Sequence, residues 1–172
     1  MDLHAFKQRI LPVQNRLFRL ATMFLRNRED AEDALQDVML RLWSNRQQLD
    51  TYQSVEALAV QITKNLCLDR LKSHARQKPV DDADLGNVPA DHLSPYRQTE
   101  LTDSASQMRR LIDELPEAQK LVLHLRDVEE YSFEEIEQVT GLSINTIRVT
   151  LSRARQRVRE GYLKVNNYES DH

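Results

Sequence analysis

The stretch that decides the fold is Tyr131–Arg159, which reads YSFEEIEQVTGLSINTIRVTLSRARQRVR. Ser132 followed by Glu135 forms a capping box, which predicts that a helix begins at this point. Gly141 predicts where that helix ends, because glycine adopts the positive φ of a helix C-terminus at little cost. Ser143 can cap a second helix, and apolar residues follow it with helical spacing at Ile147, Leu151, Ala154 and Val158.

The second of these helices is basic. Residues 144–159 contain five arginines and no acid, whereas residues 127–137 contain six acids and no base. A helix, a short turn with glycine and a basic second helix form the layout that reads DNA in the major groove. The alternative is an ordinary helical hairpin with a solvated basic face. In such a helix, acids four residues away would usually balance the arginines, and no such acids balance them here. We therefore predict DNA contacts from Asn145, Thr146, Arg148, Val149, Ser152, Arg153 and Arg155.

Apolar spacings of three and four residues predict three helices in the N-terminal half. The first is expected over residues 5–26, with the apolar stripe Phe6, Ile10, Val13, Leu17, Leu20, Ala21 and Phe24. Pro12 predicts a kink or a helix start near residues 11–12. The second helix is expected over residues 28–46, with Asp30 as its cap. After a polar loop over 47–54, Ser54 can cap a third helix whose apolar side holds Leu58, Ile62, Leu66, Leu68 and Leu71.

Composition favours an all-α protein of two small domains. The 172 residues include only three glycines and five prolines, fewer than sheet-rich folds usually need for tight turns. Residues 79–104 hold six acids and one base, and three of the prolines, and show little periodicity. We predict helical domains over residues 1–78 and 105–172, joined by a flexible acidic linker over 79–104. The second domain is expected to contain helices at about 105–114, 116–127, 132–140 and 144–163.

Several classes of protein are disfavoured by what the sequence contains. A single cysteine, Cys67, rules out an intramolecular disulfide and fits a reducing compartment, and its leucine neighbours predict that it is buried. The N-terminus does not resemble a signal peptide, and no stretch approaches the roughly 18 apolar residues that span a membrane. The five histidines show no metal spacing, and no phosphate loop or nucleophile motif occurs. We expect a cytoplasmic protein without membrane insertion, cofactor, metal or enzymatic activity.

Two sets of motifs resemble one family. LPEAQKLVL (115–123), YSFEEI (131–136) and TGLSINTIRVTLSRAR (140–155) are similar to region 4 of bacterial sigma factors, and most similar to the extracytoplasmic-function (ECF) group. In the N-terminal half, residues 27–43 with DAEDALQD (30–37) resemble sigma region 2.2, and ITKNLCLDRL (62–71) resembles region 2.4. Two motif sets in the family's order, joined by a linker, are far more specific than a single helix-turn-helix.

The resemblance implies a subunit that binds core RNA polymerase, recognises the −35 and −10 promoter elements and helps to open the duplex. It also implies an inhibitory anti-sigma factor as a partner. Asp33, Gln36 and Asp37 lie at i, i+3 and i+4 on a helix face that should be exposed. In the family, the matching face docks on the polymerase, whereas a solvated acidic face is the ordinary alternative. The runner-up function is a stand-alone helix-turn-helix regulator whose N-terminal half dimerises or senses a signal.

The resemblance also implies contacts to the −10 element from Tyr52, Lys64, Asn65, Lys72 and Arg76. Tyr52 could stack on a flipped base or could be a half-buried packing residue. Asn65 could contact DNA or hold the helix bundle together, and the basic residues could bind phosphates. Two departures from the family pattern concern DNA: Leu58-Ala59 replaces a frequent Trp-Leu pair, and Val149 replaces a small polar residue of the recognition helix. The identity of the −35 sequence therefore stays open.

Overall fold

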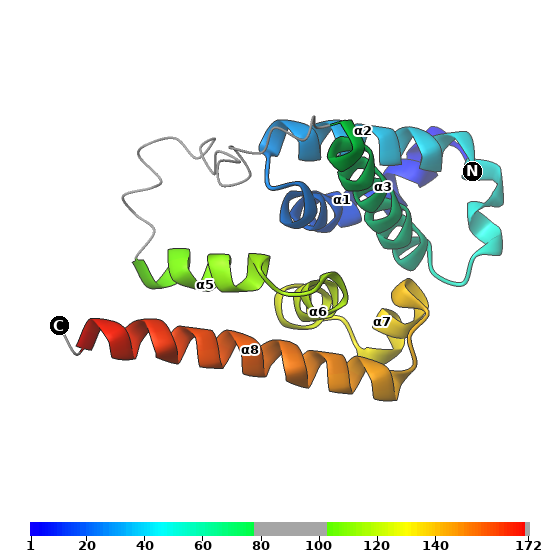
Figure 1. The fold of residues 1–172 in the computed structure, drawn as a ribbon. Helices are drawn as coiled ribbons and strands as arrows, with labels where there is room; N and C mark the ends of the chain where they lie inside the picture. The colour runs from blue at the N-terminus through cyan, green and yellow to red at the C-terminus, as the bar shows by residue number, and fades with distance from the viewer. Residues whose placement is uncertain (78–102, 171–172) are drawn as a thin grey trace. The chain divides into compact units, whose positions relative to one another are not determined.

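The computed structural model describes residues 1–77 and 103–170 (Figure 1). These residues form helices and no strand, which confirms the all-α prediction. The chain divides into two compact units, residues 1–92 and 93–172. The predicted linker, 79–104, lies outside the described residues apart from its last two, which belong to the first helix of the second unit. None of the described helices has the length and apolar character that crossing a membrane requires.

The first unit contains α1 (Leu3–Leu25), α2 (Arg28–Ser44), the 3₁₀ helix η1 (Arg46–Thr51) and α3 (Val55–Gln77). α1 packs against both α2 and α3 (Figure 1). Its buried side chains are the predicted stripe, and Ile10, Leu17 and Ala21 are completely inaccessible. Burial of apolar side chains such as these is the dominant favourable term in folding.

Pro12 does not mark the start of the first helix. α1 runs without a break from Leu3 to Leu25, and Asp2 caps it by accepting a hydrogen bond of 2.8 Å from the Ala5 N–H. Proline removes one helical N–H donor, so a carbonyl one turn earlier loses its partner. The apolar side chains buried on both sides of Pro12 offset this cost, and the helix continues through it.

Two local predictions in the first unit are wrong. The cap of α2 is Asn27, whose Oδ1 accepts from the Asp30 N–H at 3.1 Å, so Asp30 lies inside the first turn. The expected polar loop over 47–54 contains η1, whose Leu49 is completely buried. One apolar side chain among polar neighbours has no periodicity to reveal it, yet it anchors this turn to the core.

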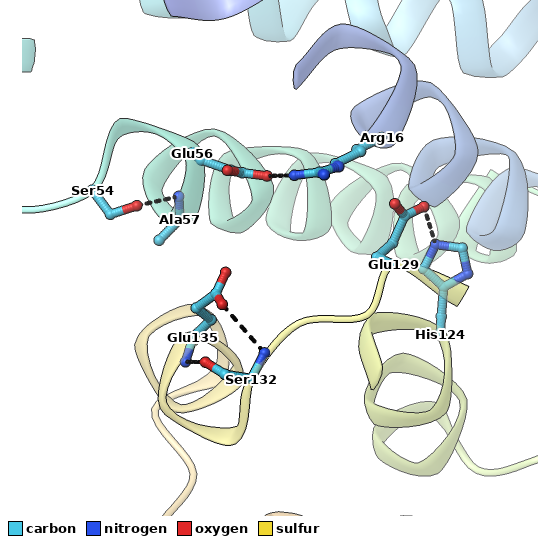
Figure 2. Close-up of polar contacts among 8 residues, drawn as sticks. All are labelled: Arg16, Ser54, Glu56, Ala57, His124, Glu129, Ser132 and Glu135. Atoms are coloured by element: carbon cyan, nitrogen blue, oxygen red, sulfur yellow. Dashed lines mark hydrogen bonds and ion pairs between the residues drawn. The ribbon is translucent and has the colours of Figure 1, made fainter. Parts of the chain in front are cut away.

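α3 buries a different face from the one expected. Ser54 caps it as predicted, with its Oγ accepting from the Ala57 N–H at 3.1 Å (Figure 2). Of the predicted apolar side only Leu66 is buried, and the core face consists of Val55, Ala59, Val60, Thr63, Leu66 and Cys67. Apolar residues occur all around this helix, so their spacing did not single out one side. The small side chains on the buried face let α3 approach its neighbours closely, and burial raises the pKa of the Cys67 thiol to about 11.

The second unit contains α5 (Asp103–Asp113), α6 (Glu117–Leu123), the π-helical turn η2 (His124–Val128), α7 (Phe133–Thr140) and α8 (Ile144–Ser170). α8 packs against α5, α6 and α7 (Figure 1). The π-turn is closed by the Glu129 N–H, which donates to the His124 carbonyl at 3.0 Å, and the two side chains approach to 3.4 Å (Figure 2). Glu130 then takes a φ of 59°, which turns the chain toward α7.

Candidate functional site

The helix-turn-helix is built as the sequence predicts. Ser132 Oγ accepts from the Glu135 N–H at 3.1 Å, and Glu135 Oε1 accepts from the Ser132 N–H at 3.3 Å (Figure 2). Gly141 ends α7 with a φ of 75°, and its N–H donates to the Glu137 carbonyl at 2.8 Å. Ser143 Oγ accepts from the Thr146 N–H at 3.2 Å and so caps α8. Both ends of the turn are therefore fixed by local hydrogen bonds.

The start of α8 presents its polar side to solvent. Ile147, Leu151 and Ala154 are buried against the rest of the unit. The side chains predicted to contact DNA are all exposed: Asn145, Thr146, Arg148, Val149, Ser152, Arg153 and Arg155. Val149 is an apolar side chain that is 42% exposed on this face, where it can make only apolar contacts. The exposed surface of the helix suits insertion into a DNA groove.

One of these arginines is already paired. Arg155 donates from Nε to Asp127 Oδ2 at 3.1 Å and from Nη2 to Asp127 Oδ1 at 2.5 Å. These hydrogen bonds raise the pKa of the Arg155 guanidinium. The pair connects α8 to η2, and it occupies two of the Arg155 nitrogens that were predicted to contact DNA. No local sequence pattern predicts this pair, because the two residues are 28 positions apart.

Arg126 is a further basic residue at this surface, and the sequence did not predict a DNA contact for it. Its guanidinium carbon lies 4.5 Å from the centre of the Phe133 ring, and that of Arg148 lies 5.2 Å from the same centre. Arg126 also donates to the Tyr131 carbonyl at 2.8 Å, which fixes its position. Phe133 thus gathers two arginines from different elements. The sequence does not mark Arg126 as part of a basic surface, because it directly precedes the acidic stretch 127–137.

The predicted polymerase-binding face on α2 includes an ion-pair network. Asp33 and Gln36 are exposed and Asp37 is half-buried. Arg70 of α3 donates from Nη1 to Asp33 Oδ2 at 2.7 Å and from Nη2 to Asp37 Oδ2. Partial burial alone would lower the pKa of Arg70, but the two carboxylates raise it above its ordinary value. The face is therefore accessible, and one guanidinium joins its two acids.

An apolar groove lies beside this face, between α1 and α2. Its volume is about 700 Å³, and Gln36 belongs to its wall. Leu3, Leu11 and Leu40 on the groove are each more than half exposed. Trp43 also lines it, with its ring edge-to-face against Phe6 at 5.1 Å between centroids and the Arg46 guanidinium 4.1 Å from its ring centre. The groove was not predicted from the sequence.

The residues predicted to contact the −10 element lie directly after η1 and on α3. Tyr52 directly follows η1 and is 47% exposed, and Lys64 is half-buried. Asn65, Lys72 and Arg76 are exposed and follow one another at i, i+7 and i+11, which places them on one face of α3. The exposure of Asn65 argues against a role inside the helix bundle.

Two ion pairs attach this region to α1. Arg9 Nη1 lies 2.5 Å from Asp50 Oδ1 in η1, and Arg16 bonds to Glu56 in the first turn of α3 (Figure 2). These pairs flank Tyr52 in the sequence. They therefore support the segment that presents the tyrosine ring.

Comparison with known proteins identifies both units. Residues 10–77 match the family model described as Sigma-70 region 2, and residues 105–158 match the one described as Sigma-70, region 4. The chain is 30% identical over 165 residues to the ECF RNA polymerase sigma factor SigM of Mycobacterium tuberculosis, covering 94% of this chain and 80% of that one. This protein belongs to the ECF family of RNA polymerase sigma factors.

Further relatives agree with this assignment. The sigma factor is 30% identical over 159 residues to ECF sigma factor SigE of Mycolicibacterium smegmatis, and it spans 60% of the length of that relative. Among solved structures it resembles the sigma factor RpoE of Bartonella quintana, in a complex with the anti-sigma factor NepR, with a TM-score of 0.72 and 25% identity. That match covers 95% of this chain and 99% of the other. Both promoter-recognition regions of the family are present in order, which favours a sigma factor over a stand-alone regulator.

Proposed function

We propose that this sigma factor binds core RNA polymerase, recognises the −35 and −10 promoter elements and promotes transcription initiation in the cytoplasm. It contributes binding and positioning and has no catalytic step or cofactor of its own. The observation that carries the proposal is the orientation of α8. This helix buries Ile147, Leu151 and Ala154 and thereby exposes its arginine-bearing side, next to a turn that is capped at both ends.

At the −35 element, Arg148 and Arg153 read base edges and Val149 meets a thymine methyl group. Both arginines are exposed, and arginine can donate two hydrogen bonds to guanine. Arg155 has a smaller part in reading bases, because Asp127 holds its guanidinium. Arg126, which lies with Arg148 at the Phe133 ring, binds a backbone phosphate. Asn145, Thr146 and Ser152 supply polar contacts from the same face.

The polymerase binds the acidic face of α2 and the adjoining apolar groove. Asp33, Gln36 and Asp37 offer carboxylate and amide groups to a basic partner, and Gln36 also lines the groove. Exposed Leu3, Leu11 and Leu40 supply apolar area beside these polar groups. An apolar centre with a polar rim is the usual composition of a specific protein interface.

At the −10 element, Tyr52 stacks on an unpaired base while α3 contacts the backbone. The ring is nearly half exposed and belongs to a segment that ion pairs attach to α1. Asn65, Lys72 and Arg76 lie on one helix face, and Lys64 adds a further positive charge. Stacking on an aromatic ring and phosphate contacts from basic residues are the usual means of holding single-stranded nucleic acid.

An anti-sigma factor is a further proposed partner. The support is that the RpoE structure, which resembles this chain over nearly its whole length, contains an anti-sigma factor. The exposed leucines of the groove in the first unit are the apolar surface that such an inhibitor needs to cover. Purification of the chain from its native cells, with identification of a co-purifying small protein, tests this expectation.

The function is tested by transcription in vitro. Core RNA polymerase from a related bacterium, the purified chain and sheared genomic DNA are combined, and the 5′ ends of the transcripts are mapped. We expect transcripts that depend on the chain and share two sequence elements upstream of their starts. Transcripts that are identical with and without the chain would contradict the proposal. A specific duplex site bound by a dimer of the chain alone would instead support the stand-alone regulator.

A further inference from the structure

Arg70 in the first unit bonds to two acids at once. Its two terminal nitrogens donate to Asp33 Oδ2 and Asp37 Oδ2, and the acids belong to a different helix. The Arg70 side chain is 28% exposed, whereas the side chains of Asp33 and Asp37 are 69% and 46% exposed. The arginine thus approaches from the protein side, and the carboxylates face outward.

The arrangement controls where the two carboxylates point. Like charges at i and i+4 of a helix repel each other, so alone they would turn apart. Each aspartate accepts a hydrogen bond from the guanidinium through its Oδ2, and the planar fork of arginine holds both in a fixed geometry. The guanidinium leaves the Oδ1 atoms of the two acids, which lie one helical turn apart in the sequence, for a partner to contact.

We propose that Arg70 is a positioning residue for polymerase binding, which holds Asp33 and Asp37 in the orientation that a basic surface of the polymerase grips. The inference rests on the proposed function of this face. Its physical basis is preorganisation. Side chains that are already ordered lose less conformational freedom when a partner binds them.

A simple contribution to stability is a poorer explanation of this arrangement. Ion pairs at the protein surface stabilise proteins little, and the side chains of Asp33 and Asp37 are 69% and 46% exposed. If Arg70 acted only through its charge, the predicted change in polymerase affinity would have the opposite sign. Loss of Arg70 leaves the two acids without a neutralising charge, so electrostatics alone would strengthen the attraction to a basic partner. The sign of the change in affinity therefore separates positioning from charge.

The test uses the full chain, core RNA polymerase from a related bacterium and a binding titration at two salt concentrations. Arg70→Met keeps the apolar stem without the charge, and Arg70→Lys keeps the charge without the fork. Arg9→Met is the control, because it breaks an arginine–aspartate ion pair elsewhere in the first unit, between α1 and η1. Thermal unfolding of each variant is measured in parallel. If Arg70→Met does not fold, the comparison rests on Arg70→Lys.

We expect Arg70→Met and Arg70→Lys each to weaken polymerase binding by about threefold to tenfold, while Arg9→Met leaves it unchanged. The loss should persist at about 0.5 M salt, where charge effects are strongly screened. In a chain that already carries Asp33→Asn and Asp37→Asn, Arg70→Met should cause no further loss, because there are no carboxylates to position.

Binding that is unchanged or tighter in both Arg70 variants would overturn the proposal. Further loss in the Asp33→Asn, Asp37→Asn background would do so as well, since Arg70 would then act through something other than the acids. Failure of the proposed function looks different. In that case, replacing Asp33 and Asp37 with alanine leaves polymerase binding intact, whatever the Arg70 variants do.

Discussion

Arg155 of the recognition helix and Asp127 of η2 form a two-point ion pair, with N–O distances of 3.1 and 2.5 Å. The pair ties α8, the second helix of the helix-turn-helix, to the π-turn that precedes α7. A residue that the sequence suggests as a DNA contact thus has a structural partner. This relationship separates Arg155 from Arg148 and Arg153, for which no carboxylate partner is seen within the described residues.

A double-mutant cycle tests the pair. We expect Arg155→Ala, Asp127→Ala and the double variant each to lower the free energy of unfolding. The coupling energy between the two substitutions should be about 0.5 kcal/mol, because both side chains are more than a third exposed. Promoter discrimination by Arg155→Ala should stay close to that of the unmodified protein. Additive effects on stability, together with a large loss of discrimination, would show that Arg155 acts on DNA and not on Asp127.

Arg148→Ala and Arg153→Ala should each reduce promoter discrimination by roughly 1–3 kcal/mol, because an arginine that grips a base edge loses its contact only at the correct sequence. The measurement is binding of polymerase holoenzyme to promoter and random duplexes. Arg157→Ala is the control, since Arg157 is exposed on α8 but was not assigned to DNA. Equal losses on promoter and random DNA would identify phosphate contacts instead.

Glu130→Gly should stabilise the second unit by about 0.5–1 kcal/mol. Glu130 has a φ of 59°, where a side chain costs energy and glycine does not. Glu137→Gly, inside α7, provides the contrast and should destabilise by about 1 kcal/mol because glycine weakens a helix interior. Chemical denaturation followed by circular dichroism measures both. A destabilising Glu130→Gly would mean that its side chain makes a contact more important than the backbone strain.

Cys67 should make stability decrease at high pH. Burial raises its pKa from 9.0 to about 11, so the folded state binds the thiol proton more tightly than the unfolded state. The stabilising contribution is complete below about pH 9 and is lost as the pH rises toward 11. The difference in unfolding free energy between the unmodified chain and Cys67→Ala, measured from pH 8 to about 11, isolates this group. A difference that does not change with pH would contradict the burial of the thiol.

The clearest predictions from sequence were those with strong local signals. Phe6 to Phe24 recur with helical spacing, and this stripe forms the core face of α1. Ser132, Gly141 and Ser143 have cap functions that depend only on neighbouring backbone, and all three act as expected. Helix caps and one-sided apolar patterns can be predicted from sequence because the interactions that form them do not depend on distant parts of the chain.

What could not be predicted depends on contacts between distant residues. The buried face of α3 was misassigned because apolar residues surround that helix, and packing against α1 and α2 selects the side with small residues. The pairing of Arg70 with Asp33 and Asp37 spans more than 30 residues. Leu40 lies off the apolar stripe of α2 and becomes part of a groove only when α1 lies beside it.

The central claim is that Asp33 and Asp37 belong to a surface that binds core RNA polymerase. The most direct test is co-elution of the chain with core RNA polymerase from a related bacterium on a sizing column. The test compares the unmodified chain with two double variants. One carries Asp33→Ala and Asp37→Ala, and the control carries Glu134→Ala and Glu137→Ala, which remove the same charge from the second unit. We predict that the unmodified chain and the control co-elute and that the Asp33, Asp37 variant, folded by circular dichroism, does not. Absence of co-elution by the unmodified chain, or its persistence in the Asp33, Asp37 variant, would contradict the claim.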